Sequence, residues 1–166
     1  MHQVAEYLSS EAKHQNGADA DAFARSAFNR YYYAAFLSVR DLLSSIDSKW
    51  GGLPHSGLPD ILEKTLVERV RKQAKNLQKT NVITESRQHA LTKQASQAST
   101  DIASILRIAY NVRVVADYKP EQFVIFNHSD FELVKHTRAE ARNWKLRVDQ
   151  AKGTLLRISK ELGLVI

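Results

Sequence analysis

The sequence predicts an all-α protein, an up-down bundle of four to five helices that forms one domain over residues 1–166. Apolar residues recur at three- and four-residue steps over long stretches, and only 6 Gly and 3 Pro interrupt the chain. Long helices with narrow apolar seams must pack on one another, and short connections make neighbouring helices antiparallel. The one alternating run, at 122–126, is too short and too isolated to predict a sheet.

One cluster of helix breakers divides the first half of the chain. Residues 50–59 read WGGLPHSGLP, a segment that no helix can cross. Before it we predict a helix near 2–15 and a long helix near 19–48. Asp19 and Asp21 lie at the start of that long helix, where capping explains them better than acid–base chemistry.

The second half is predicted to hold a shorter helix near 59–79 and long helices near 86–117 and 130–162. The last of these is expected to begin at the N-cap Asp130, with Glu132 in its first turn. The seams of the long helices predict a core that contains the following residues: Phe28, Tyr32, Ala35, Val39, Leu42, Ile102, Ile105, Ala109, Val112, Val148, Leu155 and Ile158.

Composition excludes several functional classes. With 0 Cys the chain has no disulfide, no thiolate zinc site and no cysteine nucleophile. The first residues, MHQVAE, have no basic stretch before an apolar run, and no window approaches the roughly 18 apolar residues of a membrane span. We therefore expect a cytoplasmic protein that does not bind membranes.

The net charge of +6 is unevenly distributed. Residues 59–80 carry 6 basic and 3 acidic side chains and residues 131–166 carry 8 and 4, so these two segments hold the excess. Such a segment either attracts a phosphate backbone or forms a solvated helix surface, and the modest excess favours the solvated surface.

Neither a metal site nor a phosphate-binding glycine loop is predicted. The 6 His include no pair at the three- or four-residue spacing of helical metal ligands. Gly51-Gly52 and Gly57 lack both a preceding strand and the Lys-Ser/Thr that follows such a loop. We expect no metal and no cofactor.

Three consecutive tyrosines follow Asn29 and Arg30 in the string NRYYYAAF, residues 29–36. On a helix they point in directions about 100° apart, so they cannot all face the core. Tyr32 lies on the apolar seam and is expected to pack there. Asn29, Arg30 and Tyr33 are equally open to packing or to a binding role.

A second group of polar residues ends the predicted helix near 86–117, in the string RIAYNVRVVADY, residues 107–118. Arg113 and Asp117 are four residues apart and lie on one helix face. Two interpretations stay open: a surface ion pair, or an arginine oriented by the aspartate for phosphate binding.

Together these strings resemble motifs of the HEPN superfamily, small α-helical domains of prokaryotic toxin–antitoxin and defence modules. One branch carries Ser-Arg-x-Tyr-Tyr-Ala-x-Phe on one helix and Arg-x-x-Ala-Asp-Tyr at the end of another. Residues 29–36 depart from the first string only at Asn29, and residues 113–118 match the second. His55-Ser56-Gly57 matches a turn often found between them, so the resemblance covers residues 20–120.

The resemblance implies a homodimer in which the arginine motifs of two subunits face each other across a composite cleft. Active members cleave RNA without metal through an Arg-x4–6-His motif, in which Arg stabilises the phosphorane and His moves the 2′-OH proton. Here Tyr118 occupies the place of that His, and a tyrosine with a pKa of about 10 is a poor base. The resemblance assigns candidate catalytic roles to Arg113, Asp117 and Tyr118, and RNA- or nucleotide-binding roles to Asn29, Arg30, Tyr33 and His55.

Three functions follow as alternatives. The first is a HEPN-like dimer of a toxin–antitoxin or phage-defence module that binds RNA or a nucleotide, with cleavage left open. The second is a non-catalytic helical module that docks a cognate antitoxin, a nucleotidyltransferase-like protein or another partner. The third is a metal-independent ribonuclease in which His55 replaces the missing histidine, against the simpler interpretation of His55 as an exposed turn residue or a helix cap.

Overall fold

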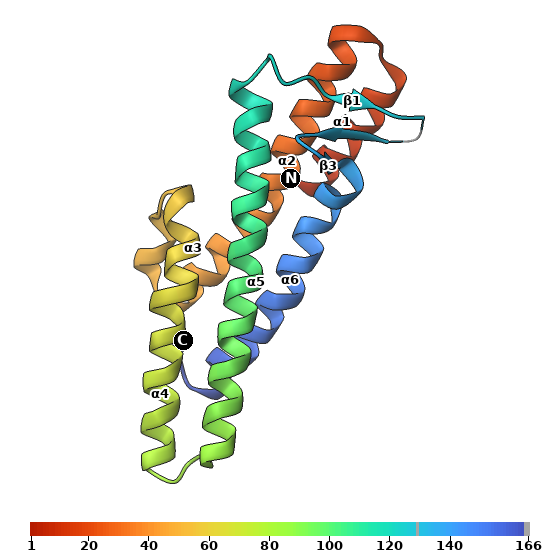
Figure 1. The fold of residues 1–166 in the computed structure, drawn as a ribbon. Coiled ribbons are helices and arrows are strands. Elements are labelled where there is room, and N and C mark those ends of the chain that lie inside the picture. Colours follow the sequence, from red (N-terminus) through yellow and green to blue (C-terminus); the bar gives the residue numbers. More distant parts are fainter. Residues whose placement is uncertain (129, 165–166) are drawn as a thin grey trace. The chain divides into compact units, whose positions relative to one another are not determined.

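The structure is a computed structural model that describes residues 1–128 and 130–164, and it is mostly helical, as predicted (Figure 1). By their internal contacts the residues divide into two compact units. Unit 1 comprises residues 1–37 and 106–147, and unit 2 comprises residues 38–105 and the chain from 148 onward. The single domain expected over residues 1–166 stays a prediction.

Three long helices contribute residues to both units. They are α2 (Gly17–Ile46), α5 (Glu85–Tyr118) and α6 (Arg138–Glu161). Every residue predicted for the core from the seams of these helices is buried, with no more than 3% exposure. None of the helices in the described part of the chain is long and apolar enough to cross a bilayer.

Unit 1 combines α1 (His2–His14) with the first part of α2, the last part of α5, the first part of α6 and a small sheet. Its core is aromatic, because Phe28 and Tyr32 of α2 are buried together with Phe131 of the sheet. The rings of Phe28 and Phe131 meet edge to face, with centroids 5.6 Å apart.

The sheet contradicts the expectation that no sheet would form. Strands β1 (Ile125–Phe126), β2 (Phe131–Leu133) and β3 (His136–Thr137) pair antiparallel in that order. Val134 and Lys135 join β2 to β3 with φ angles of 52° and 62°, and a type I′ hairpin turn requires positive φ at both positions. Such turns usually carry Asn or Gly, so this one lacks the sequence signal that would have predicted the hairpin.

The last helix does not begin at Asp130, so this prediction is wrong. Residues 131–133 and 136–137 form strands β2 and β3 instead. Thr137 is the cap: its Oγ1 accepts from the Glu140 amide at 3.1 Å, and Glu140 Oε2 accepts from the Thr137 amide at 3.0 Å. Asp130 Oδ1 instead accepts from the Arg138 Nε at 2.6 Å and from the Phe131 amide. Glu132 lies on β2 and not in a helical turn.

Unit 2 contains the break that the sequence predicted at residues 50–59. Two short 3-10 turns, η1 (Ser48–Gly52) and η2 (His55–Gly57), occupy most of it. They lead into α3 (Leu58–Asp60), the π-helical turn η3 (Ile61–Leu66) and α4 (Val67–Lys79), which form one helical run close to the predicted 59–79. Each four-residue step along this run buries an apolar side chain: Leu58, Leu62, Leu66, Val70 and Ala74.

A short turn connects α4 to α5 within unit 2, and the two helices run antiparallel (Figure 1). Asn81 has a φ of 58°, its amide donates to the Gln78 carbonyl, and the Val82 amide donates to the Leu77 carbonyl at 2.9 Å. These bonds form a Schellman motif, which satisfies the last carbonyls of α4. The turn therefore fixes the exposed face of α4 beside the first turns of α5.

Candidate functional site

The two polar strings singled out in the sequence meet in unit 1, at the end of α5. Asn29 and Tyr33 lie one turn apart on α2, Arg113 and Asp117 lie one turn apart on α5, and Tyr118 ends α5. We call these five residues the Arg113 cluster. Its members come from the strings 29–36 and 107–118, so the structure brings together five of the seven predicted site residues.

Arg113 and Asp117 form the ion pair that their spacing predicts. Arg113 Nε lies 2.9 Å from Asp117 Oδ2, and the two side chains are 17% and 25% exposed. The Nε–H does not point at the oxygen well enough for a hydrogen bond, so the contact is an ion pair and not an aligned fork. The buried Nε of Arg113 therefore has no hydrogen-bond partner among the described residues, whereas the Tyr118 hydroxyl is a hydrogen-bond partner of the guanidinium.

Asn29 holds the same carboxylate from α2. Its Nδ2 donates to Oδ1 and Oδ2 of Asp117, at 2.7 and 2.9 Å. Asn29 is the position at which the chain departs from the serine of the resembling motif, and the longer amide side chain reaches both oxygens. The Oδ1 of Asn29 is buried and has no hydrogen-bond partner among the described residues, which leaves an unused acceptor in the cluster.

Aromatic side chains surround the guanidinium. The Arg113 guanidinium carbon lies 5.2 Å from the centroid of the Tyr118 ring, a cation–π contact. Burial alone would lower the pKa of Arg113, but the Asp117 carboxylate, the Tyr118 hydroxyl and Tyr33 outweigh it, and the pKa is raised. Arg113 is therefore fully charged throughout the physiological pH range.

Tyr32 also belongs to this environment, which the sequence did not predict. It is buried as expected, and its ring packs against Tyr33 at 5.3 Å and against Tyr110 at 5.9 Å. Burial raises the pKa of Tyr32 far above its usual value, and the charge of Arg113 opposes that rise. The tyrosine hydroxyl therefore lies within electrostatic range of Arg113 and stays protonated at neutral pH.

Two predicted site residues are not part of the cluster. Arg30 is half-buried on α2, and its side chain makes no ion pair or hydrogen bond within the described residues. His55 lies in η2 of unit 2. The interactions of Arg113 with the described residues involve carboxylate and tyrosine groups and no histidine.

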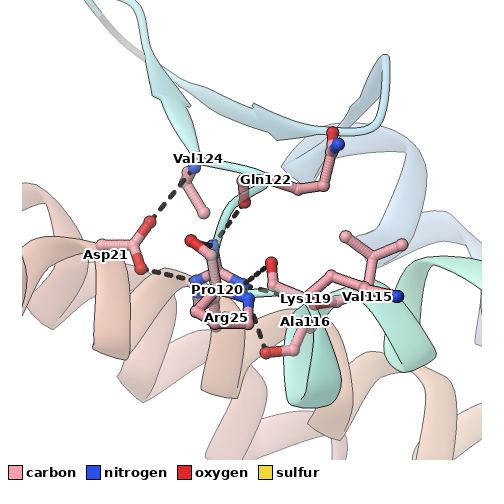
Figure 2. Close-up of polar contacts among 8 residues, drawn as sticks. All are labelled: Asp21, Arg25, Val115, Ala116, Lys119, Pro120, Gln122 and Val124. Atoms are coloured by element: carbon pink, nitrogen blue, oxygen red, sulfur yellow. Dashed lines mark hydrogen bonds and ion pairs between the residues drawn. The ribbon is translucent and has the colours of Figure 1, made fainter.

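A second arginine of unit 1, Arg25 on α2, is attached to the end of α5 and to the segment that follows it (Figure 2). Its Nε pairs with Asp21, one turn earlier on the same helix. Its Nη1 and Nη2 donate to a set of backbone carbonyls: Val115, Ala116, Lys119, Pro120 and Gln122.

Asp21 completes this Arg25 clasp. Its Oδ1 accepts from the Val124 amide at 3.1 Å, so one aspartate holds both the arginine and the chain that leads to β1. Asp21 was expected to cap the start of α2, and this prediction is wrong because the carboxylate is engaged by Arg25 and Val124 instead. The four-residue spacing of Asp21 and Arg25 was the available sequence signal. The clasp fixes the end of α5 on which Asp117 and Tyr118 lie.

The cluster supports binding chemistry more directly than proton transfer. A guanidinium fixed by a neighbouring carboxylate is suited to a phosphate oxygen, which accepts from its remaining N–H groups. Among the described residues no group of three or more His, Asp or Glu is placed to hold a metal ion.

In comparisons with known proteins, no protein-family model, no curated protein and no solved structure matches the chain. The assignment to the HEPN superfamily therefore remains a hypothesis that rests on the motifs quoted above.

Proposed function

We propose that the chain is a HEPN-like helical bundle that acts as a homodimer in a toxin–antitoxin or phage-defence module. In this proposal Arg113 binds a phosphate group of RNA or of a nucleotide. The observation that carries the proposal is the arrangement of three residues. Asn29 holds both oxygens of Asp117, and Asp117 contacts Arg113 at Nε, so the guanidinium is positioned while its buried Nε–H has no hydrogen-bond partner among the described residues.

The chemistry of the cluster fits a nucleotide in one further respect. The buried Asn29 Oδ1 is an acceptor that a 2′-hydroxyl or a base N–H of the ligand would satisfy. An inorganic anion would bind the guanidinium and leave this acceptor unsatisfied.

Substitutions of Arg113 test this function. We expect Arg113→Lys to weaken binding of RNA and AMP, because the ammonium keeps the charge but loses the planar fork, and Arg113→Ala to weaken it about tenfold or more. Asp117→Asn should have a smaller effect, since it removes the orienting charge but keeps a hydrogen-bonding oxygen. Binding is measured by fluorescence anisotropy and calorimetry at two salt concentrations, with cell growth during expression as a second readout.

Arg142→Ala is the matched control. Arg142 also lies in unit 1 and pairs with one carboxylate, Glu6 at 3.0 Å, but it is not part of the cluster. The control should bind like the wild type. If Arg113→Ala also binds and behaves like the wild type, the Arg113–Asp117 contact is only a helix ion pair and the proposed function is wrong.

The dimer is tested separately. We expect the interface to include the end of α5, and analytical ultracentrifugation to show dimers at tens of micromolar, where an interface of modest affinity still associates. A monomer throughout this range would contradict the dimer.

A non-catalytic interaction module is the second candidate function, and exposed apolar side chains in unit 1 favour it. Phe123 is 76% exposed, Ile125 56% and Phe126 41%, on and next to the edge strand β1. Contiguous exposed apolar surface is typical of protein interaction sites. This candidate predicts that Phe123→Asp abolishes co-purification with the product of a neighbouring nucleotidyltransferase-like or antitoxin gene, while Arg113→Ala has no effect.

A further inference from the structure

Helix α4 of unit 2 presents a row of basic side chains that the Arg113 cluster does not use. Arg71, Lys72, Lys75 and Lys79 are all exposed, and we call them the α4 ridge. Glu68 pairs with Arg71 at 2.6 Å and with Lys72 at 3.6 Å, so one acidic side chain faces two cations. Lys75 and Lys79 make no ion pair within the described residues, and the ridge carries an uncompensated positive charge.

The spacing of the ridge suits a polymer of anions. Arg71, Lys75 and Lys79 follow one another at four-residue steps, and each step advances about 6 Å along a helix. The three cations therefore extend over about 12 Å, a length that a single mononucleotide phosphate cannot neutralise. A nucleic acid backbone carries charges repeated along its length and contacts several of these cations at once.

Hollows lie on both sides of the ridge. One hollow measures 540 Å³ and is lined by Arg71, Lys75 and Gln78 of α4 and by Gln88 and His89 of α5, together with the acidic side chains of Glu68 and Glu85. The other measures 770 Å³, and Lys72 lines both. The amide and imidazole groups beside the cations offer hydrogen bonds to unstacked bases and riboses.

The apolar content of the run argues against a membrane or a protein as the occupant. Its apolar stripe, from Leu58 to Ala74, is completely buried within unit 2, and no large hydrophobic side chain between residues 58 and 80 is among the exposed ones. A helix that lies in a membrane surface needs exposed apolar side chains, and the centre of a protein interface is depleted in charge. A polar, positively charged surface is typical of nucleic acid binding.

We propose that the α4 ridge binds the phosphate backbone of single-stranded RNA, independently of base sequence and separately from the Arg113 cluster. The choice of RNA as the polymer rests on the proposed function, whereas the preference for a polyanion rests on the ridge itself. The ridge increases the affinity for long RNA by adding phosphate contacts, and it contributes nothing to the binding of a mononucleotide.

The test compares two double variants of the full chain. Lys75→Gln/Lys79→Gln removes two exposed ridge cations, and Lys93→Gln/Lys160→Gln removes two exposed lysines elsewhere in unit 2; none of the four forms an ion pair within residues 1–128 and 130–164. Binding of a labelled single-stranded RNA of about 20 nucleotides is measured by anisotropy over a range of salt concentrations. We expect about fivefold or greater weakening in the ridge variant, and a fall of about 1.4 in the slope of log affinity against log salt, which corresponds to two phosphate contacts.

Other ligands and variants separate the outcomes. AMP binding should be unchanged in the ridge variant and weakened about tenfold or more in Arg113→Ala. Duplex RNA and anionic vesicles should bind more weakly than the single strand. If Arg113→Ala leaves AMP binding unchanged while the ridge variant weakens RNA binding, the proposed function is wrong and the proposal for the α4 ridge is supported. The proposal for the α4 ridge would be wrong if the ridge variant and the lysine control bound RNA with equal affinity. It would also be wrong if the ridge substitutions weakened binding to anionic vesicles alone.

Discussion

Two arginines of unit 1, Arg25 and Arg113, both act at the end of α5, yet they are engaged in different ways. Their side chains are similarly sheltered, with 12% and 17% exposure. Arg25 binds Asp21 and five backbone carbonyls (Figure 2). Arg113 instead has one carboxylate and one aromatic ring as its main contacts. Exposure alone does not distinguish the two arginines, whereas the number of backbone carbonyls that each contacts does.

The difference has a physical origin. The last carbonyls of an α-helix have no partner within the helix, and a cation at this end also interacts favourably with the helix dipole. Arg25 reaches these carbonyls from α2 and donates hydrogen bonds to them. Arg113 lies earlier on α5, where the carbonyls are already bonded within the helix, so it does not engage them.

The largest expected effect is that of Arg25→Ala on stability. It leaves the carbonyl groups at the end of α5 and the Asp21 carboxylate without their partner, and we expect the free energy of unfolding to fall by about 2–3 kcal/mol. Arg113→Ala should cost less than about 1 kcal/mol, because it removes a partly exposed ion pair. Urea denaturation of both variants measures the difference in the free energy of unfolding. Equal losses of stability in the two variants would contradict the distinction between Arg25 and Arg113.

Asn29→Ala is expected to have an intermediate effect. The variant removes two hydrogen bonds to the Asp117 carboxylate, and we expect it to cost about 1 kcal/mol of stability. It should also weaken AMP binding, because Asp117 is then free to rotate away from Arg113. Wild-type affinity for AMP in Asn29→Ala would show that Asn29 does not position the cluster.

A third arginine of unit 1, Arg138, extends the comparison to pH. Burial alone would raise the pKa of Asp130, but hydrogen bonds from Arg138 and the Phe131 amide outweigh it and hold the pKa below its usual value. Since the unfolded value is about 3.9, the pair stabilises the protein above pH of about 4, and this contribution is lost as the pH falls through the lower folded value. Asp130→Asn should therefore be less stable than the wild type at pH 7, and the gap should narrow near pH 3. A gap of the same size at both pH values, measured by urea denaturation, would contradict this.

The smallest expected effect is a gain in stability from substitutions in the turn between β2 and β3. Val134 is β-branched and has a positive φ, which is unfavourable for such a residue. Replacing Val134 and Lys135 by Asn and Gly, the residues that type I′ turns prefer, should raise the free energy of unfolding by about 0.5–1 kcal/mol. A lower melting temperature for this variant would show that the contacts of the Val134 side chain stabilise the protein by more than its positive φ destabilises it.

The sequence predicts what depends on one helix and misses what depends on the packing between elements. The spacing of apolar residues predicted the long helices and the core, and the spacing of Arg113 and Asp117 predicted their ion pair. Asn29 was recognised as a candidate but not as the partner of Asp117, since that contact joins α2 to α5. The carbonyl acceptors of Arg25 carry no side-chain pattern at all, so the clasp was not predicted.

The hairpin shows the same limit from another side. Phe131 and Leu133 are buried on β2. They were expected in the following helix because Asp130 was predicted to be its N-cap, and the turn at Val134-Lys135 lacks the Asn and Gly that would have indicated a hairpin. The Thr137-x-x-Glu140 capping box was present in the sequence and would have placed the start of α6 correctly.

The central claim is that Arg113 is positioned by Asp117 and remains available to a phosphate group, and arginine side-chain NMR tests it most directly. The Nε–H resonance of Arg113 is identified by its absence in Arg113→Lys, and AMP is then titrated into the wild-type protein. We predict that the Arg113 resonance shifts progressively with AMP while the Arg25 resonance does not move. An Arg113 resonance that stays unchanged at AMP concentrations up to the millimolar range would contradict the claim.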